Sequence, residues 1–123
     1  MKKMLFVISN TPYANTHNAE LLEAAMVGAV FDGIVSILFR DDGVYSLLPD
    51  QHGELIGQKT ISKMLSALPT YEVERLFACA DSITKRALTI TSSPEVVALS
   101  LAEQTRLIAE QDVVIGAQLW AYI

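Results

Sequence analysis

The chain has 123 residues, which is typical of one domain, and 51% of them are hydrophobic, with a mean hydropathy of +0.34. This composition excludes a disordered chain. Fourteen acidic and nine basic residues give a net charge of −5, so we expect no direct binding of nucleic-acid phosphates. One cysteine excludes an intrachain disulfide, and with only two histidines we expect no metal site.

The first residues place two lysines before a short apolar run, Met4–Ile8. The run stops at Ser9, which makes it shorter than the hydrophobic region of a signal peptide. No stretch approaches the roughly 18 apolar residues that cross a membrane. We therefore expect a cytoplasmic protein that binds no membrane and keeps its thiol reduced.

Two unbroken apolar runs, Met4–Ile8 and Ile34–Phe39, predict strands that are covered on both faces of a sheet. The stretch Asn18–Phe31 between them is long enough for a helix. We expect this helix to end at Asp32-Gly33, with Gly33 in the left-handed conformation. A strand, a helix and a strand in this order predict a parallel βαβ unit with a right-handed crossover.

The next segments continue the alternation of helices and strands. Apolar residues at the i, i+3, i+4, i+7 spacing predict a helix over Leu55–Leu68, which Pro69 stops. We expect a strand over Val73–Cys79. A short helical segment over Asp81–Arg86 follows and leads into Leu88–Thr91.

The last third of the chain predicts one more helix and one more strand. Ser93-Pro94-Glu95 predicts a helix start, because serine caps helices, proline fits the first turn and an acid favours the positive end. This helix would carry the apolar positions of 97–109, and Val113–Ile115 would be the last core strand. The whole pattern predicts a single three-layer α/β domain over residues 1–123, with a mostly parallel sheet of about five strands.

The predicted first helix is apolar almost all around, with Glu20 and Glu23 as the clearly polar positions. Such a helix needs cover on more than one side. The C-terminal residues Leu119–Ile123 add apolar surface beyond the last strand. We expect subunit contacts here and a protein that does not function as a monomer. The alternative is a helix deep against the sheet, with the tail covering the same core.

Ligand sites in open parallel sheets lie at the carboxyl ends of the strands, here the loops after Ser9, Arg40 and Cys79. The first of these loops, residues 10–17, contains no glycine. Close backbone approach to a phosphate needs glycine, which argues against a nucleotide- or flavin-binding loop. We therefore expect no bound cofactor.

The polar residues of these loops favour structural roles. His17 has no carboxylate partner that the sequence can assign, so we expect it on the surface, and we expect Thr11 and Thr16 in turns or caps. Asp41 and Asp42 are adjacent, and neighbouring side chains in a turn usually diverge. These two carboxylates therefore predict a turn rather than a metal site.

Cys79 is the candidate sulfur carrier of the chain. It lies at the predicted end of a strand, where the free N–H groups of a following helical segment favour a thiolate. Lys85 and Arg86 close that segment and would add positive potential, while Asp81 opposes it. A thiolate attacks sulfane sulfur by the same displacement chemistry as thiol–disulfide exchange. The alternative is a buried, inert cysteine.

Three segments of the chain resemble the DsrE-like family of sulfur-relay proteins, and within it the TusC/DsrF type of subunit: MLFVISNTPY (4–13), VFDGIVSILFRDDGVYSLLPDQ (30–51) and FACADSITKRAL (77–88). DDGVY followed by LLPDQ is the most specific part. The resemblance implies a cytoplasmic hetero-oligomer with TusB-like and TusD-like sister chains. Such a complex passes persulfide sulfur from a donor protein to an acceptor protein, toward 2-thiouridine formation at the tRNA wobble position. The chain would then be an accessory subunit of a sulfurtransferase complex.

The resemblance leaves two alternatives open, a subunit of the Dsr version that serves sulfur oxidation and a free-standing DsrE-like homo-oligomer that carries sulfur itself. It places Cys79 on the sulfur-carrying cysteine of the DsrE/TusD type of subunit, and Lys85 and Arg86 on the family's basic pair. Ala87 stands in place of the family's glycine. The TusC/DsrF type completes the assembly rather than acting as the principal sulfur acceptor.

Overall fold

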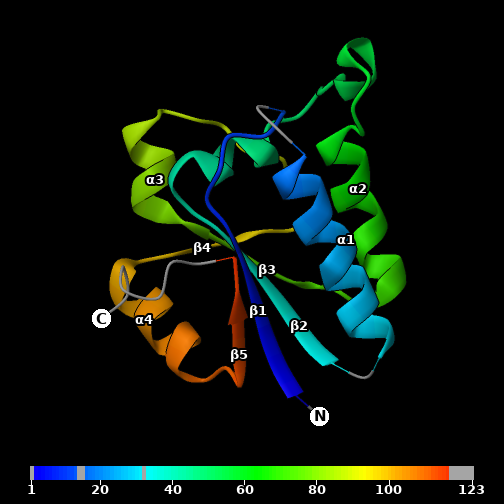
Figure 1. The fold of residues 1–123 in the computed structure, drawn as a ribbon. Coiled ribbons are helices and arrows are strands. Elements are labelled where there is room, and N and C mark those ends of the chain that lie inside the picture. Colours follow the sequence, from blue (N-terminus) through cyan, green and yellow to red (C-terminus); the bar gives the residue numbers. More distant parts are fainter. Residues whose placement is uncertain (1, 14–15, 32, 117–123) are drawn as a thin grey trace.

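The computed structural model describes residues 2–13, 16–31 and 33–116, in which strands alternate with helices (Figure 1). The strands are β1 (Lys2–Ile8), β2 (Gly33–Phe39), β3 (Arg75–Cys79), β4 (Val97–Leu99) and β5 (Val113–Ile115). The α-helices are α1 (His17–Val30), α2 (Ile61–Ala67), α3 (Ala80–Lys85) and α4 (Leu101–Ala109). The connections contain the 3-10 turns η1 (Asp41–Leu47), η2 (Gly53–Ile56) and η3 (Leu68–Tyr71).

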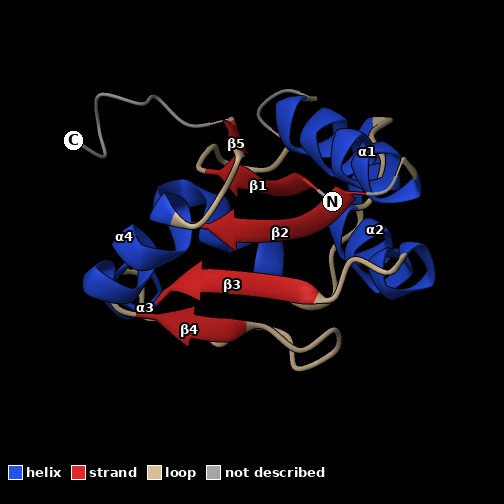
Figure 2. Ribbon diagram, turned by 90° about the horizontal axis from the view of Figure 1, so that it is seen from below, coloured by secondary structure: helices blue, strands red, loops and turns tan. Residues whose placement is uncertain are grey.

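The five strands form one sheet in the order β4-β3-β2-β1-β5, and every pairing is parallel (Figure 2). This confirms the predicted α/β domain with its parallel sheet. The chain adds β1 to β4 in one direction and then crosses back to place β5 on the other side of β1. Because crossovers are right-handed, the reversal puts α4 on the face opposite α1 and α2 (Figure 1).

The sheet is buried on both faces, which explains the unbroken apolar runs of its central strands. On the face covered by α1 and α2, Phe6 and Ile37 pack with Leu22. On the opposite face, Leu5 packs with Leu107 of α4. Successive residues of each strand alternate between these two cores.

The first βαβ unit forms as predicted, with one correction at its turn. The chain passes from α1 into β2, but Gly33 is the first residue of β2 and is not left-handed. A Cβ at Gly33 would lie 2.8 Å from the carbonyl oxygen of Gly28. The glycine is therefore required for close backbone packing and not for a helix cap.

The helix predicted over Leu55–Leu68 is divided in two. Gly57 ends η2 with φ +72°, and α2 begins only at Ile61. A left-handed residue cannot continue a right-handed helical turn, which explains the break. Ile61 and Leu65 are buried in the core as their spacing predicts.

The helix predicted to start at Ser93 starts after Ser100 instead. Ser100 Oγ accepts a hydrogen bond from the Glu103 N–H at 3.2 Å, and Glu103 Oε1 accepts one from the Ser100 N–H at 2.9 Å. This capping box outweighs the local Ser-Pro-Glu pattern. The residues before it, Val97–Leu99, pair with Phe77–Cys79 as a strand.

The outer face of α1 is exposed in the isolated chain. The helix buries one side against the sheet, while Val27, Val30 and Phe31 are exposed, Phe31 to 80%. Together with Tyr71 of η3 they line an apolar groove of about 290 Å³. The predicted apolar surface of this helix is thus present and uncovered, and the tail Leu119–Ile123 lies outside the described residues.

Candidate functional site

Cys79 is the last residue of β3 and caps the N-terminus of α3. Its side chain is buried, 3% exposed, and Sγ accepts a hydrogen bond from the Ser82 N–H at 3.4 Å. Cys79 lies on the same face as Phe77, the face that α4 covers, and it is the register partner of Leu99. The sulfur therefore lies where α3 and α4 both begin.

Ser82 connects this sulfur to the loop after β2. The backbone N–H of Asp41 donates to the buried Ser82 Oγ at 3.0 Å, and the Ser82 side chain lowers the pKa of the Cys79 thiol. A hydroxyl that accepts one hydrogen bond still has its own proton to donate, so it can favour a neighbouring thiolate. The first residue of η1 thus holds the side chain that favours the Cys79 thiolate.

Gln104 of α4 is the second side chain that favours the Cys79 thiolate. Gln104 is 2% exposed, and its Nε2 donates to the Leu99 carbonyl oxygen at 3.1 Å. Its side chain also lowers the pKa of the Cys79 thiol. Its Oε1 has no hydrogen-bond partner among the described residues. The N–H groups after Cys79 were predicted to favour the thiolate, whereas the side chains of Ser82 and Gln104 were not identified from the sequence. A helix start at Ser100 would have placed Gln104 on the inward face of α4, three residues before the buried Leu107.

The environment of Cys79 favours the thiolate. Burial raises the pKa of the Cys79 thiol, but hydrogen bonds from the Ser82 and Gln104 side chains and from the backbone N–H groups of Ser82 and Asp81 outweigh it. The pKa of Cys79 therefore lies below its ordinary value. A thiolate held in this way is a nucleophile.

The two basic residues after Cys79, Lys85 and Arg86, form ion pairs within α3 and between α3 and η1. Lys85 Nζ lies 3.0 Å from Asp81 Oδ2, and Arg86 donates to Asp42 Oδ1 through Nη2 at 2.9 Å and Nε at 3.2 Å. Arg86 Nη1 also donates to the carbonyl oxygen of Ser82 at 3.2 Å. Both cations are thus paired with carboxylates, and the groups that favour the thiolate are neutral donors.

The other predicted positions take structural roles. Asp41 faces Arg40 at 3.8 Å while Asp42 faces Arg86, so the adjacent carboxylates diverge as expected. Within residues 2–13, 16–31 and 33–116, no three His, Cys, Asp or Glu residues are placed to hold a metal ion. Ala87 takes φ +51°, the left-handed conformation that glycine adopts without strain. Alanine is therefore strained at this turn, where glycine would not be.

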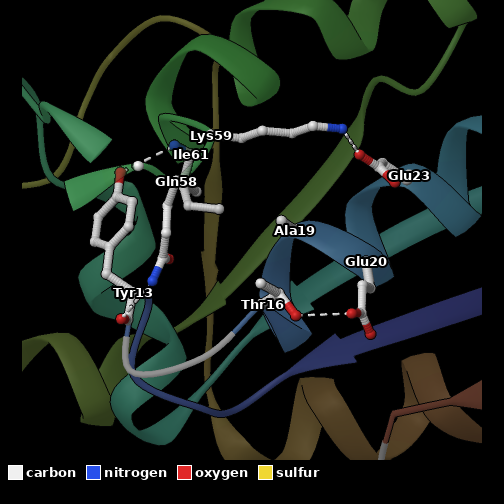
Figure 3. A pocket seen from close by; sticks show the side chains of 9 residues that line it. Tyr13, Thr16, Ala19, Glu20, Glu23, Gln58, Lys59 and Ile61 are labelled. Carbon is white, nitrogen blue, oxygen red and sulfur yellow. Dashed lines mark hydrogen bonds and ion pairs between the residues drawn. The ribbon is translucent and has the colours of Figure 1, made fainter. Parts of the chain in front are cut away.

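A separate pocket of about 280 Å³ lies between α1 and the segment that leads into α2. Figure 3 shows Lys59 reaching Glu23, and Thr16 donating to Glu20 Oε1 at 2.7 Å. Gln58 Nε2 donates to the carbonyl oxygen of Tyr13 at 3.1 Å. These polar groups bind one another, so they join α1 to the neighbouring loop. His17 is exposed at the start of α1, as predicted.

No helix in the described parts of the chain is long and apolar enough to span a bilayer.

Comparisons with known proteins agree on a family. The profile of the DsrE/DsrF-like family matches residues 2–116. The chain is 39% identical over 89 residues to the intracellular sulfur oxidation protein DsrF of Allochromatium vinosum, covering 72% of this chain and 65% of that protein, which is less than two thirds of its length. It is 37% identical over 89 residues to a TusC homolog of Pseudomonas aeruginosa, covering 72% of this chain and 75% of that protein.

A solved structure is similar over nearly the whole chain. The crystal structure of the ychN protein from E. coli superposes with a TM-score of 0.78 and 20% sequence identity, covering 94% of this chain and 98% of that one. At this level of identity the likeness concerns the fold.

Proposed function

Because the chain belongs to the DsrE/DsrF-like family, we propose that it acts as a TusC/DsrF-like subunit of a sulfur-relay complex. The observation that carries this proposal is the 37–39% identity to proteins named TusC and DsrF. Those names indicate a sulfur-relay subunit, which is a component of an assembly and not a stand-alone metabolic enzyme. The partners we propose are TusB-like and TusD-like sister chains, together with a sulfur donor and a sulfur acceptor protein in the cytoplasm.

The pathway that we propose is the transfer of persulfide sulfur toward 2-thiouridine at the tRNA wobble position. Similarity to the TusC homolog supports this pathway. Similarity to DsrF, whose name states intracellular sulfur oxidation, supports the alternative of a Dsr-type subunit. Both pathways require the same chemistry, the movement of sulfane sulfur between thiols.

Cys79 is the residue that we propose as the sulfur carrier. Its thiolate attacks the outer sulfur of a donor persulfide, R–S–S–H. A bond forms between Cys79 Sγ and that sulfur, the S–S bond of the donor breaks, and the donor leaves as the thiolate R–S⁻. The proton stays on the transferred sulfur, so no oxidant or reductant is needed. The lowered pKa of Cys79 supports this role.

Removal of this chain from its source organism tests the pathway. We expect the 2-thiouridine content of wobble positions to fall, because the relay loses a subunit, and to recover when the chain is restored. Mass spectrometry of digested tRNA measures the content. Unchanged 2-thiouridine together with impaired sulfur oxidation would favour the Dsr alternative, and no change in either would refute both.

The apolar groove on α1 is the surface that we assign to a sister subunit. Co-expressed TusB-like and TusD-like chains should co-purify with the wild-type chain, whereas Phe31→Asp should reduce their recovery at least about tenfold. The substitution weakens binding in two ways. It removes the aromatic ring that the contact would bury, and it places a carboxylate that would lose its hydration in an apolar contact. Gel filtration and mass spectrometry of the complex measure the recovery.

Leu55→Asp is the matched control for this experiment. Leu55 lies in η2 outside the groove and is 81% exposed, against 80% for Phe31. We expect the control to co-purify normally. Equal recovery of the sister chains by both variants would show that the groove is not the contact surface.

The donors around Cys79 favour a second candidate, a homo-oligomer that carries sulfur without sister chains. Ser82 and Gln104 both belong to this chain, so the site needs no residue from another subunit. A stable assembly of this chain alone that takes up sulfur would favour this candidate. Sulfur uptake only in the presence of the sister chains would exclude it.

A further inference from the structure

One side of α1 lines two neighbouring cavities. Glu20, Glu23, Val27 and Val30 follow the spacing i, i+3, i+7 and i+10, which places them in one stripe along the helix. The pocket of about 280 Å³ shown in Figure 3 lies against the first half of this stripe, and the apolar groove of about 290 Å³ lies against the second half. Glu23 lines both, so the pocket and the groove adjoin as one surface along α1.

The pocket is the acidic end of this surface. Its lining contains two carboxylates, Glu20 and Glu23, and one ammonium group, that of Lys59. Lys59 forms an ion pair with Glu23 (Figure 3). Glu20 is exposed, and its Oε1 accepts a hydrogen bond from the neutral Thr16 hydroxyl at 2.7 Å. Among the residues that the structure describes, no side-chain cation is paired with Glu20, so a negative charge stands beside the groove.

The groove is the apolar end of the same surface. Val27 and Val30 are 55% and 64% exposed, and the exposed rings of Phe31 and Tyr71 also line the groove. A segment that covers it must therefore present apolar side chains. Glu20 precedes Val27 by seven residues, or about 10 Å along the helix axis. A basic side chain that reaches Glu20 must thus lie about 10 Å from the apolar side chains of the same segment.

We propose that this surface binds an amphipathic segment of a sister subunit, which places apolar side chains in the groove and a lysine or arginine against Glu20. This inference rests on the proposed function, which assigns the groove to a sister chain, and it adds the charge that the partner must carry. Charge complementarity favours this occupant over a second copy of the chain. A second copy would bring the same net charge of −5, whereas a basic segment is attracted.

The test compares two substitutions of Glu20 with a matched control. Glu20→Lys reverses the charge, and Glu20→Gln removes the charge and keeps a hydrogen-bond acceptor for Thr16. The control is Glu110→Lys, because Glu110 is an exposed carboxylate at the end of α4, on the opposite face of the sheet, and its reversal changes the net charge equally. Circular dichroism establishes that each variant is folded.

The measurement is the affinity of the chain for a co-purified pair of TusB-like and TusD-like chains, by isothermal titration calorimetry at about 0.05 M and about 0.5 M sodium chloride. We expect Glu20→Lys to weaken binding at least about fivefold at low salt, because an attraction becomes a repulsion, and Glu20→Gln to weaken it less. At high salt the difference from wild type should fall below about twofold, since salt screens exposed charges. Glu110→Lys should stay within about twofold of wild type at both concentrations.

Three outcomes would overturn the proposal. Equal binding of the sister chains by Glu20→Lys and Glu110→Lys would overturn the contact with a basic residue and leave the proposed function intact. No binding of the sister chains by wild type would overturn the proposed function and this partner with it. Self-association of the chain that Glu20→Lys disrupts and Glu110→Lys does not would assign the surface to a second copy.

Discussion

Gly43→Ala should destabilise the protein by about 3 kcal/mol, because the added methyl group collides with backbone that cannot move. A Cβ at Gly43 would lie 1.9 Å from the carbonyl oxygen of Ile8 and 3.0 Å from the backbone nitrogen of Ser9. That carbonyl oxygen accepts the Arg40 N–H at 3.0 Å, so displacing it breaks the contact between the ends of β1 and β2. Urea unfolding followed by circular dichroism measures the loss.

Gly57→Ala is the matched control for this variant. Gly57 has φ +72° and nothing within 4 Å of its Cβ position, so alanine there meets only the strain of the left-handed conformation. That strain costs about 1 kcal/mol. If Gly43→Ala lost no more stability than Gly57→Ala, the close approach of η1 to β1 would not be as tight as the structure has it.

The same substitution should also reach the candidate site. Gly43 lies in η1 two residues after Asp41, whose N–H orients the Ser82 hydroxyl at 3.0 Å. A shift of η1 therefore disturbs the Ser82 side chain, which helps to lower the pKa of the Cys79 thiol. Alkylation of Cys79 in Gly43→Ala, measured where the variant is still folded, should be slower than in Gly57→Ala.

Cys79→Ser should abolish the addition of sulfur to the chain completely. Cys79 is the single cysteine, and a serine hydroxyl is not ionised at neutral pH and forms no persulfide. We expect the fold to persist, because a serine oxygen can accept the Ser82 N–H in place of Sγ, which accepts it at 3.4 Å in the wild type. Mass spectrometry of the intact chain after exposure to a persulfide donor measures the addition.

The assembled complex separates the carrier role from an architectural one. With Cys79→Ser in a complex that still contains its sister chains, sulfur transfer to the acceptor should stop. Transfer at the wild-type rate would show that sulfur passes through another subunit. Cys79 would then be a packing residue of this chain.

The parallel sheet follows from the sequence because its determinants are local. Met4–Ile8 and Ile34–Phe39 are apolar at every position, as strands between two helical layers require. The spacing of Ile61 and Leu65 also identifies the buried side of α2. The errors concern where helices begin. Gly57 divides the helix predicted over Leu55–Leu68, and the last helix begins after Ser100 rather than after Ser93, because strand pairing and a reciprocal cap decide its start.

The sequence by itself determined the parallel α/β fold, and it identified Cys79 as the candidate nucleophile at a strand end. Only the tertiary structure decided what surrounds the sulfur. Gln104 is distant from Cys79 in the sequence. It lies near Leu99, the register partner of Cys79, because the order of strand addition reverses after β4 and α4 therefore covers the opposite face of the sheet. Lys85 and Arg86 are close to Cys79 in the sequence, yet their charged groups are paired with the carboxylates of Asp81 and Asp42. Spacing along a chain specifies neighbours within one element, whereas contacts between elements depend on the crossover that brings them together.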